Sequence, residues 1–359
     1  MSNPDNPGNN IYRCTPRQVR AMAIDAIEAG LVPFVRGSPG VGKSSIFRNI
    51  ANQFNVEMID HRVSTSAPED FTGLPEFLAR EDGTRIARFS PFGDLFPIKG
   101  TPIPDGKDGW LLFLDEFNSG TKMVQAAAYK LILDKMTGQY PLHERVAIAL
   151  AGNLETDRAI TTTLSTAMQS RVIHIEMQVS HQEWLEDVAL KEHYDERIIA
   201  FLGFAEKYLM DFRPDHDEKT FCCPRTWEFM NKLIKGKEVT QEKTALYAGT
   251  ITSGVAAEFV AFCQLKDELV TIKDVLRDPE NAPIPEGHNA AQRKWIIVTH
   301  LMTQANEENL HDLSTYINRM DMAFRVLFFR GLMVQQPKLR THPKFAVAMQ
   351  TLTKYLSGN

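Results

Sequence analysis

The chain has 359 residues, of which 43% are hydrophobic and 24% charged, as is ordinary for a soluble globular protein. That length predicts two or three domains, each able to bury its own core. With 40 basic and 45 acidic residues the net charge is −5, which argues against a protein that coats nucleic acid but leaves a local basic patch open.

The N-terminus and the cysteines favour a cytoplasmic protein. The first ten residues, MSNPDNPGNN, are polar and rich in turn formers, so we expect a disordered tail and no signal peptide. The apolar stretch 326–334 is interrupted by Arg330, so we expect no membrane span. The cysteines form no C-x-x-C pair, and we interpret them as reduced thiols. They are Cys14, Cys222, Cys223 and Cys263.

A glycine-rich loop follows the first predicted helix. The helix signals are Thr15 as N-cap, Pro16 at the first helical position and Gln18 completing a capping box, with Gly30 at the end. The loop fits the pattern G-x-x-x-x-G-K-[ST] at every fixed position. It consists of Gly37, Ser38, Pro39, Gly40, Val41, Gly42, Lys43 and Ser44.

The residues on either side of this loop give the context that a phosphate-binding loop requires. A strand-like run ends at Phe34-Val35, and Pro33 should stand at its start because proline cannot donate to a sheet. Apolar residues from 46 to 54 recur at helical spacing. The alternative is that the motif is an accidental glycine-rich turn. The strand before the loop and the helix after it argue against that alternative.

The loop's residue types suit a nucleotide with Mg²⁺. Its glycines let the backbone fold around an anion, toward which the amides and the helix N-terminus point their positive ends. Lys43 would reach the outer phosphates, and the Ser44 hydroxyl would hold Mg²⁺. Ser45, directly after the motif, is included among the expected cofactor-binding residues.

Strands and helices alternate up to about residue 179. A hairpin is predicted around Asp82-Gly83, between 77–79 and 86–89, and a loop at 100–109. Other strands are predicted at 56–59, 110–114, 146–150 and 172–175, with a helix at 123–136. Continuous apolar strands belong in a parallel sheet covered on both faces, so we predict a doubly wound α/β domain with helices on both faces.

Beyond about Val179 the pattern is helical. Ser180 with Glu183 predicts a helix start, Pro224 fits the first turn of another, and prolines mark a loop near 278–285. Helical spacing returns from 310 to 317 and from 345 to 356, either as core faces or, less favoured, as a partner-binding stripe. We predict a core at 1–178, an α-helical lid at 179–270 and a C-terminal α-helical extension at 271–359.

Polar residues follow two of the buried strands. Asp115 and Glu116 come directly after 111–114, where Asp115 could hold Mg²⁺ and Glu116 could deprotonate an attacking water. The alternative is that the two acids cap the following helix. Asn153 follows 146–150 and could hydrogen-bond the water or terminal phosphate, although an isolated Asn there is more often a turn residue.

Together these motifs resemble an AAA+ ATPase, and within that superfamily the MoxR group. The phosphate loop reads GSPGVGKS, the acidic strand LLFLDEFN, the next strand AIALAGN, and a later helix opens with CPRTW. PEDFTG, the hairpin and RFSPFG resemble the insert that MoxR-like proteins carry, and LSTAMQSRVIHIEM resembles the stretch before the last core strand. The resemblance covers roughly residues 15–230.

The resemblance also implies roles for three residues beyond the phosphate loop. Asn153 would be the sensor-one residue, and Arg225 the sensor-two arginine reaching the nucleotide from the lid. Arg171 would be the arginine that projects into a neighbouring subunit's site. The group usually has an aromatic residue where Val172 stands, and Arg158 is a rival finger. Ordinary surface ion pairs are the alternative for Arg171 and Arg225.

The resemblance implies an ATP-hydrolysing, chaperone-like remodeller that forms a ring, expected to be a hexamer. Its partners would be a protein client and a separate chain with a von Willebrand factor A domain, and the hairpin at 82–83 is a candidate client contact. A clamp-loader or initiator-like ATPase acting on nucleic acid is the alternative, kept open by the basic stretch 338–344. A nucleotide-gated switch that barely hydrolyses is disfavoured by the intact acidic pair.

Overall fold

The computed structural model describes residues 12–157, 162–265, 270–343, 345–348 and 352. The chain divides into two compact units, the first formed by Met1–Val179 with Arg213–Asp215, and the second by Ser180–Phe212 with His216–Asn359. The predicted boundary between a lid and a C-terminal extension, at 270 and 271, stays a prediction.

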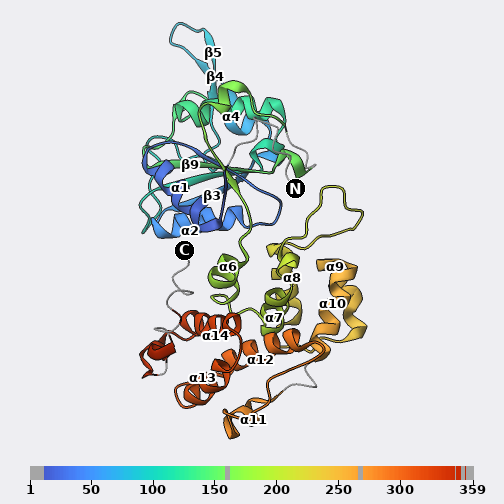
Figure 1. The fold of residues 1–359 in the computed structure, drawn as a ribbon. Helices are drawn as coiled ribbons and strands as arrows, with labels where there is room; N and C mark the ends of the chain where they lie inside the picture. The colour runs from blue at the N-terminus through green and yellow to red at the C-terminus, as the bar shows by residue number, and fades with distance from the viewer. Residues whose placement is uncertain (1–11, 158–161, 266–269, 344, 349–351, 353–359) are drawn as a thin grey trace. The chain divides into compact units, whose positions relative to one another are not determined.

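The first unit is built on a parallel sheet of six strands in the order β1-β10-β2-β9-β6-β3. Figure 1 shows its strands and helices. The strands are β1 (Arg13–Cys14), β2 (Pro33–Arg36), β3 (Glu57–Arg62), β6 (Trp110–Asp115), β9 (Val146–Gly152) and β10 (Ile173–Met177). The longer helices are α1 (Pro16–Glu28), α2 (Lys43–Gln53) and α4 (Lys122–Asp134). Shorter ones are α3 (Pro68–Thr72), α5 (Thr166–Gln169) and the 3-10 turns Val63–Thr65, Phe117–Ser119 and Glu155–Asp157.

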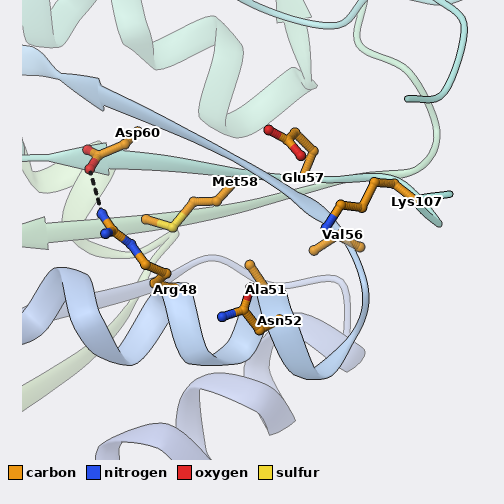
Figure 2. A pocket seen from close by; sticks show the side chains of 8 residues that line it. All are labelled: Arg48, Ala51, Asn52, Val56, Glu57, Met58, Asp60 and Lys107. Atoms are coloured by element: carbon orange, nitrogen blue, oxygen red, sulfur yellow. Dashed lines mark ion pairs between the residues drawn. The ribbon is translucent and has the colours of Figure 1, made fainter. Parts of the chain in front are cut away.

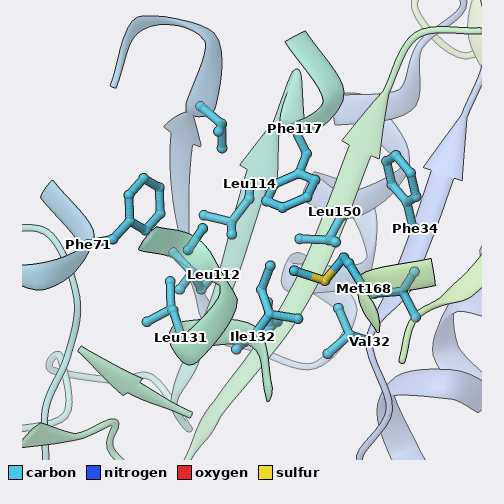
Figure 3. Close-up of a cluster of buried hydrophobic side chains, with 14 of the residues drawn as sticks. Val32, Phe34, Phe71, Leu112, Leu114, Phe117, Leu131, Ile132, Leu150 and Met168 are labelled. Atoms are coloured by element: carbon cyan, nitrogen blue, oxygen red, sulfur yellow. The ribbon is translucent and has the colours of Figure 1, made fainter. Parts of the chain in front are cut away.

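Both faces of this sheet are covered, because successive residues of a strand point to opposite sides. Leu112 and Leu150 pack in one cluster with Leu131 of α4 (Figure 3). Phe113 points the other way, and its ring centroid lies 4.9 Å from that of Phe47 in α2. Helices thus cover both faces of a parallel sheet, and helices follow it, so the predicted fold class is confirmed.

The predicted start of α1 is confirmed by its hydrogen bonds. The Thr15 backbone N–H donates to Gln18 Oε1 at 2.9 Å, and the Gln18 N–H donates to Thr15 Oγ1 at 3.5 Å. Pro16 occupies the first turn, where its missing N–H costs nothing. Gly30, just past the helix, has φ +73°, a conformation that favours glycine. Pro33 stands at the start of β2, as its chemistry required.

The predicted hairpin is present as β4 (Leu74–Ala79) and β5 (Arg85–Ser90). In its turn, the Thr84 backbone N–H and hydroxyl donate to Asp82 Oδ1 at 2.9 and 2.6 Å. Phe77 is 71% exposed and Phe89 is 46% exposed. Because Phe77 pairs with Ala87, two residues before Phe89, both phenyl rings lie on the same face of the hairpin.

A second hairpin was not predicted, and it corrects one helix boundary. The helix expected at 123–136 ends at Asp134, because Lys135 adopts a left-handed conformation with φ +51°. Strands β7 (Met136–Thr137) and β8 (Tyr140–Pro141) follow. The Thr137 hydroxyl donates to the Phe71 carbonyl at 3.0 Å, so tertiary contacts hold this segment extended.

The described elements of the second unit are helices and helical turns, apart from an isolated antiparallel bridge between Asp211 and Cys222. Its helices are α6 (His181–Trp184), α7 (Glu196–Phe204), α8 (Pro224–Ile234), α9 (Thr244–Ile251), α10 (Ser253–Gln264), α11 (Ile272–Arg277), α12 (Ala290–Gln304), α13 (Leu310–Asn318) and α14 (Met322–Gln335). A π-helical turn covers Leu185–Ala189, and 3-10 turns cover Glu206–Leu209, Gln241–Lys243 and Pro337–Thr341.

Several predicted features of this unit are confirmed. The Ser180 side chain caps α6, and Pro224 lies in the first turn of α8. Leu310, Leu313 and Ile317 are buried on α13. Of the last predicted stripe, Phe345 and Leu352 are buried, and its residues 349 and 356 lie outside the described part.

Two predictions about the whole chain can be compared with the structure. All four cysteines have free thiols, as predicted. Among the described residues, no helix combines the length and the apolar character that crossing a bilayer requires.

The close packing of α7 and α12 gives a test of the second unit. A Cβ added at Gly203 would lie 2.3 Å from Cζ3 of Trp295. We expect Gly203→Ala to lower the free energy of unfolding by about 1–3 kcal/mol through overpacking. Gly249→Ala in α9, where a Cβ meets nothing within 4 Å, should instead raise it by about 0.5–1 kcal/mol. Urea denaturation of both variants checks the pair, and equal effects would contradict the packing.

Candidate nucleotide-binding site

The glycine-rich loop runs from the end of β2 to the start of α2, as predicted. Gly40 and Gly42 have φ +76° and +99°, values that side chains with a Cβ rarely adopt. The Gly37 N–H donates to the Gly152 carbonyl at 3.2 Å, which ties the loop to the end of β9. A Cβ at Gly37 would lie 3.1 Å from the Met177 carbonyl oxygen, so a residue with a side chain would be crowded at this position.

The strand order brings Lys43 and Asn153 together. β9 lies between β2 and β6, so the segments that follow these three parallel strands emerge at one edge of the sheet. Lys43 is only 9% exposed, and its Nζ donates to the Gly37 carbonyl at 2.6 Å and the Ser38 carbonyl at 3.1 Å. Nζ also donates to Asn153 Oδ1 at 3.3 Å. A buried ammonium ion held by carbonyl and amide oxygens is available to an incoming anion at this edge.

Ser44 and Asp115 meet at the same edge. The Ser44 hydroxyl, in the first turn of α2, donates to Asp115 Oδ2 at 3.0 Å. Asp115 is the last residue of β6. A hydroxyl and a carboxylate oxygen within hydrogen-bond distance are hard oxygen donors of the kind that Mg²⁺ prefers, so these residues fit the ion that the sequence predicted.

Glu116 is held in a defined conformation by its neighbours. Its backbone is left-handed, with φ +53°, and its N–H donates to Asp115 Oδ1 at 2.8 Å. Its carboxylate accepts a hydrogen bond from the Ser64 hydroxyl. Ser64 lies just after β3, the strand beside β6, and was not predicted as a site residue. The sequence signal was weak, because a serine after a strand is an ordinary turn residue.

Asn118 is a second residue that the sequence reading missed. Its Nδ2 donates to the Asn153 carbonyl at 2.8 Å, and its Oδ1 accepts from the Asn153 N–H at 3.0 Å. The side chain is buried, and a Cβ at Gly152 would lie 2.4 Å from its Oδ1. Asn118 therefore fixes the backbone that carries Asn153, a role visible only once the two strands are adjacent.

The two predicted arginines, Arg171 and Arg225, belong to different units of the chain. Arg171 lies on the surface of the first unit, where its Nη1 donates to the Tyr129 hydroxyl at 3.0 Å. Arg225 is exposed and stands in the first turn of α8 in the second unit. Arg158, the rival finger, lies outside the described residues. Their roles stay predictions.

A small pocket of about 250 Å³ lies elsewhere, along α2 and the edge strand β3 (Figure 2). Arg48 approaches Asp60 there, with Nη2 3.9 Å from Oδ2. Burial raises the pKa of the Asp60 carboxyl, and the charge of Asp115 raises it further. The other lining residues are Ala51, Asn52, Val56, Glu57, Met58 and Lys107. No residue of the phosphate loop lines it, so we assign it no part in nucleotide binding.

Comparison with known proteins leaves the family open. No family model and no curated protein matches the chain. Among solved structures, a point mutant of RuvB from Thermotoga maritima is similar, with 17% identity, a TM-score of 0.36, and 86% of this chain and 91% of that chain covered. NtrX of Brucella abortus has 13% identity and a TM-score of 0.34, covering 94% and 67%. A candidate ATPase of Cytophaga hutchinsonii has 16% identity and a TM-score of 0.32, covering 50% of this chain.

The chain spans 56% of the length of that Cytophaga protein. TM-scores of this size support no conclusion about function. The assignment of the candidate site therefore depends on the chain's own glycine-rich loop, strand order and hydrogen bonds.

The paired hydrogen bonds of Asn118 generate a stability test. We expect Asn118→Ala to lower the free energy of unfolding by about 1–3 kcal/mol, because the Asn153 N–H and carbonyl lose their partner. Asn153→Ala keeps both of those backbone hydrogen bonds, so it should lower the free energy of unfolding by clearly less than Asn118→Ala does. Thermal and urea denaturation of the two variants measures the difference. A larger loss in Asn153→Ala would contradict the assignment of Asn118 as the residue that holds this backbone.

Proposed function

We propose that this protein is a Mg²⁺-dependent ATPase of the AAA+ superfamily, resembling its MoxR group. The observation that carries the proposal is that predicted residues from three separate strand ends meet at one edge of the sheet. Lys43 contacts Asn153, and Ser44 contacts Asp115, across 110 and 71 residues of sequence. Such an edge, at the carboxyl ends of parallel strands, is where α/β sheets bind ligands.

Each residue has a distinct task in ATP hydrolysis. Lys43 would exchange its carbonyl partners for phosphate oxygens, and the loop amides would bind the same anion. Ser44 and Asp115 would hold Mg²⁺, which neutralises phosphate charge when bound. Glu116 would take the proton of the attacking water, which requires its carboxylate to leave the Ser64 hydroxyl. Asn153 would orient that water through its amide.

The wider assignment includes a ring, most simply a hexamer, in which Arg171 acts on a neighbouring subunit and Arg225 acts from the lid. Its support is the resemblance, together with the exposure of Arg171 on the surface of the first unit. An arginine supplied in trans stabilises charge on a transferred phosphoryl group. We propose a protein client and a separate partner with a von Willebrand factor A domain, so that ATP turnover remodels or activates a protein complex.

Two substitutions separate binding from hydrolysis. We expect Lys43→Ala to weaken ATP binding itself, because the phosphates lose their buried cation. Glu116→Gln should bind ATP with near-parental affinity yet hydrolyse it about 10²–10⁴-fold more slowly, because the water loses its base. Calorimetry measures ATP binding, and phosphate release measures hydrolysis. Lys122→Ala is the control, because it removes a lysine that is exposed and lies outside the site. Equal turnover in Glu116→Gln and the parent would refute the base assignment.

The exposed apolar face of the β4–β5 hairpin gives a test of client contact. We expect the double change Phe77→Ser and Phe89→Ser to leave basal ATP turnover within about twofold, since neither ring belongs to the nucleotide site, and to abolish client-stimulated turnover. Leu246→Ser, which removes an exposed apolar side chain from α9, serves as control. Loss of basal turnover, or full stimulation without the two rings, would count against the hairpin.

A further inference from the structure

A buried carboxylate stands beside the phosphate loop and has no role in the site as described so far. Asp157 closes the 3-10 turn Glu155–Asp157, four residues after Asn153. It is 8% exposed, and its Oδ2 is buried without a hydrogen-bond partner among the described residues. Its backbone N–H donates to the Leu154 carbonyl at 3.2 Å, which fixes the turn. A buried carboxylate oxygen without a donor is costly, so its position calls for a physical reason.

The surroundings of Asp157 connect it to the phosphate loop. Burial raises the pKa of its carboxyl, while the Ser38 hydroxyl and the Lys43 ammonium oppose the rise. The negative charge of Glu176 in β10 also raises the pKa of the Asp157 carboxyl, by less than burial does. Ser38 and Lys43 both belong to the glycine-rich loop, and the Lys43 ammonium already contacts Asn153 from the same segment. The buried carboxylate therefore stands four residues along the chain from Asn153, which directly contacts the cation that the proposed function assigns to phosphate.

We propose that Asp157 is a counter-ion of the nucleotide-free loop that sets the affinity for phosphate. Its negative charge stabilises Lys43 and Ser38 when no anion is bound. The same charge opposes each phosphate that enters, because like charges in a poorly solvated site repel strongly. Asp157 is thus a positioning and affinity-setting residue rather than a catalytic one. The penalty grows with the charge of the ligand, so a triphosphate meets more of it than a diphosphate. This inference rests on the proposed nucleotide binding.

The test uses the full chain with Asp157→Asn, which keeps the shape and an oxygen acceptor for Ser38 but removes the charge. Calorimetry measures the affinity for ATP, ADP and adenosine with Mg²⁺ present. We expect ATP to bind about tenfold more tightly than to the parent, ADP to gain less, and adenosine to be unchanged. Glu155→Gln is the matched control, because it removes an exposed carboxylate from the same turn and should change ATP affinity less than about twofold.

The possible outcomes distinguish a failure of this inference from a failure of the proposed ATPase function. Parental ATP affinity in Asp157→Asn would overturn the counter-ion role, and so would weaker binding of all three ligands together, which indicates a structural role. If Asp157→Asn does not fold, as judged by circular dichroism, Asp157→Ser removes the same charge with a smaller side chain and must give the same order of gains. Failure of the parent to bind ATP at all would instead refute the proposed function.

Discussion

The candidate site depends on one constraint, the adjacency of β2, β9 and β6 in a parallel sheet. Parallel strands end at the same edge, so the order alone places the phosphate loop, Asn153 and Asp115 beside one another. The hydrogen bond from Gly37 to Gly152 fixes how far the loop extends past β9. The apolar faces of the sheet hold that register, because a slip by one residue would turn its buried side chains toward the opposite face.

The charged groups of the candidate site are one buried ammonium ion and three carboxylates. Lys43 is the buried cation, and the carboxylates belong to Asp115, Glu116 and Asp157. The Ser44 hydroxyl donates to Asp115 and the Ser64 hydroxyl donates to Glu116, while the Ser38 hydroxyl acts on Asp157. In the function that we propose, an incoming phosphate and its Mg²⁺ would replace these hydrogen-bond partners.

The sequence predicted those parts whose chemistry is local. The capping box at Thr15, the proline at the start of β2, the turn at Asp82-Gly83 and the glycine loop each depend on backbone preferences within a few residues. The end of α4 was predicted two residues too late, because Lys135 turns left-handed where β7 joins the neighbouring Phe71 carbonyl through Thr137. That contact spans 66 residues, so no local pattern could reveal it.

By itself the sequence determined the α/β class, the loop from Gly37 to Ser44 and the acidic pair at 115 and 116, because apolar spacing and fixed motif positions are written along the chain. Only the tertiary structure decided which side chains support them. Three residues that are ordinary turn residues in sequence gain their partners through the strand order. Ser64 bonds Glu116, Asn118 bonds Asn153, and Asp157 interacts with the glycine-rich loop. The physical reason is that hydrogen bonds and charge interactions depend on distance in space, which the folded sheet sets and sequence separation does not.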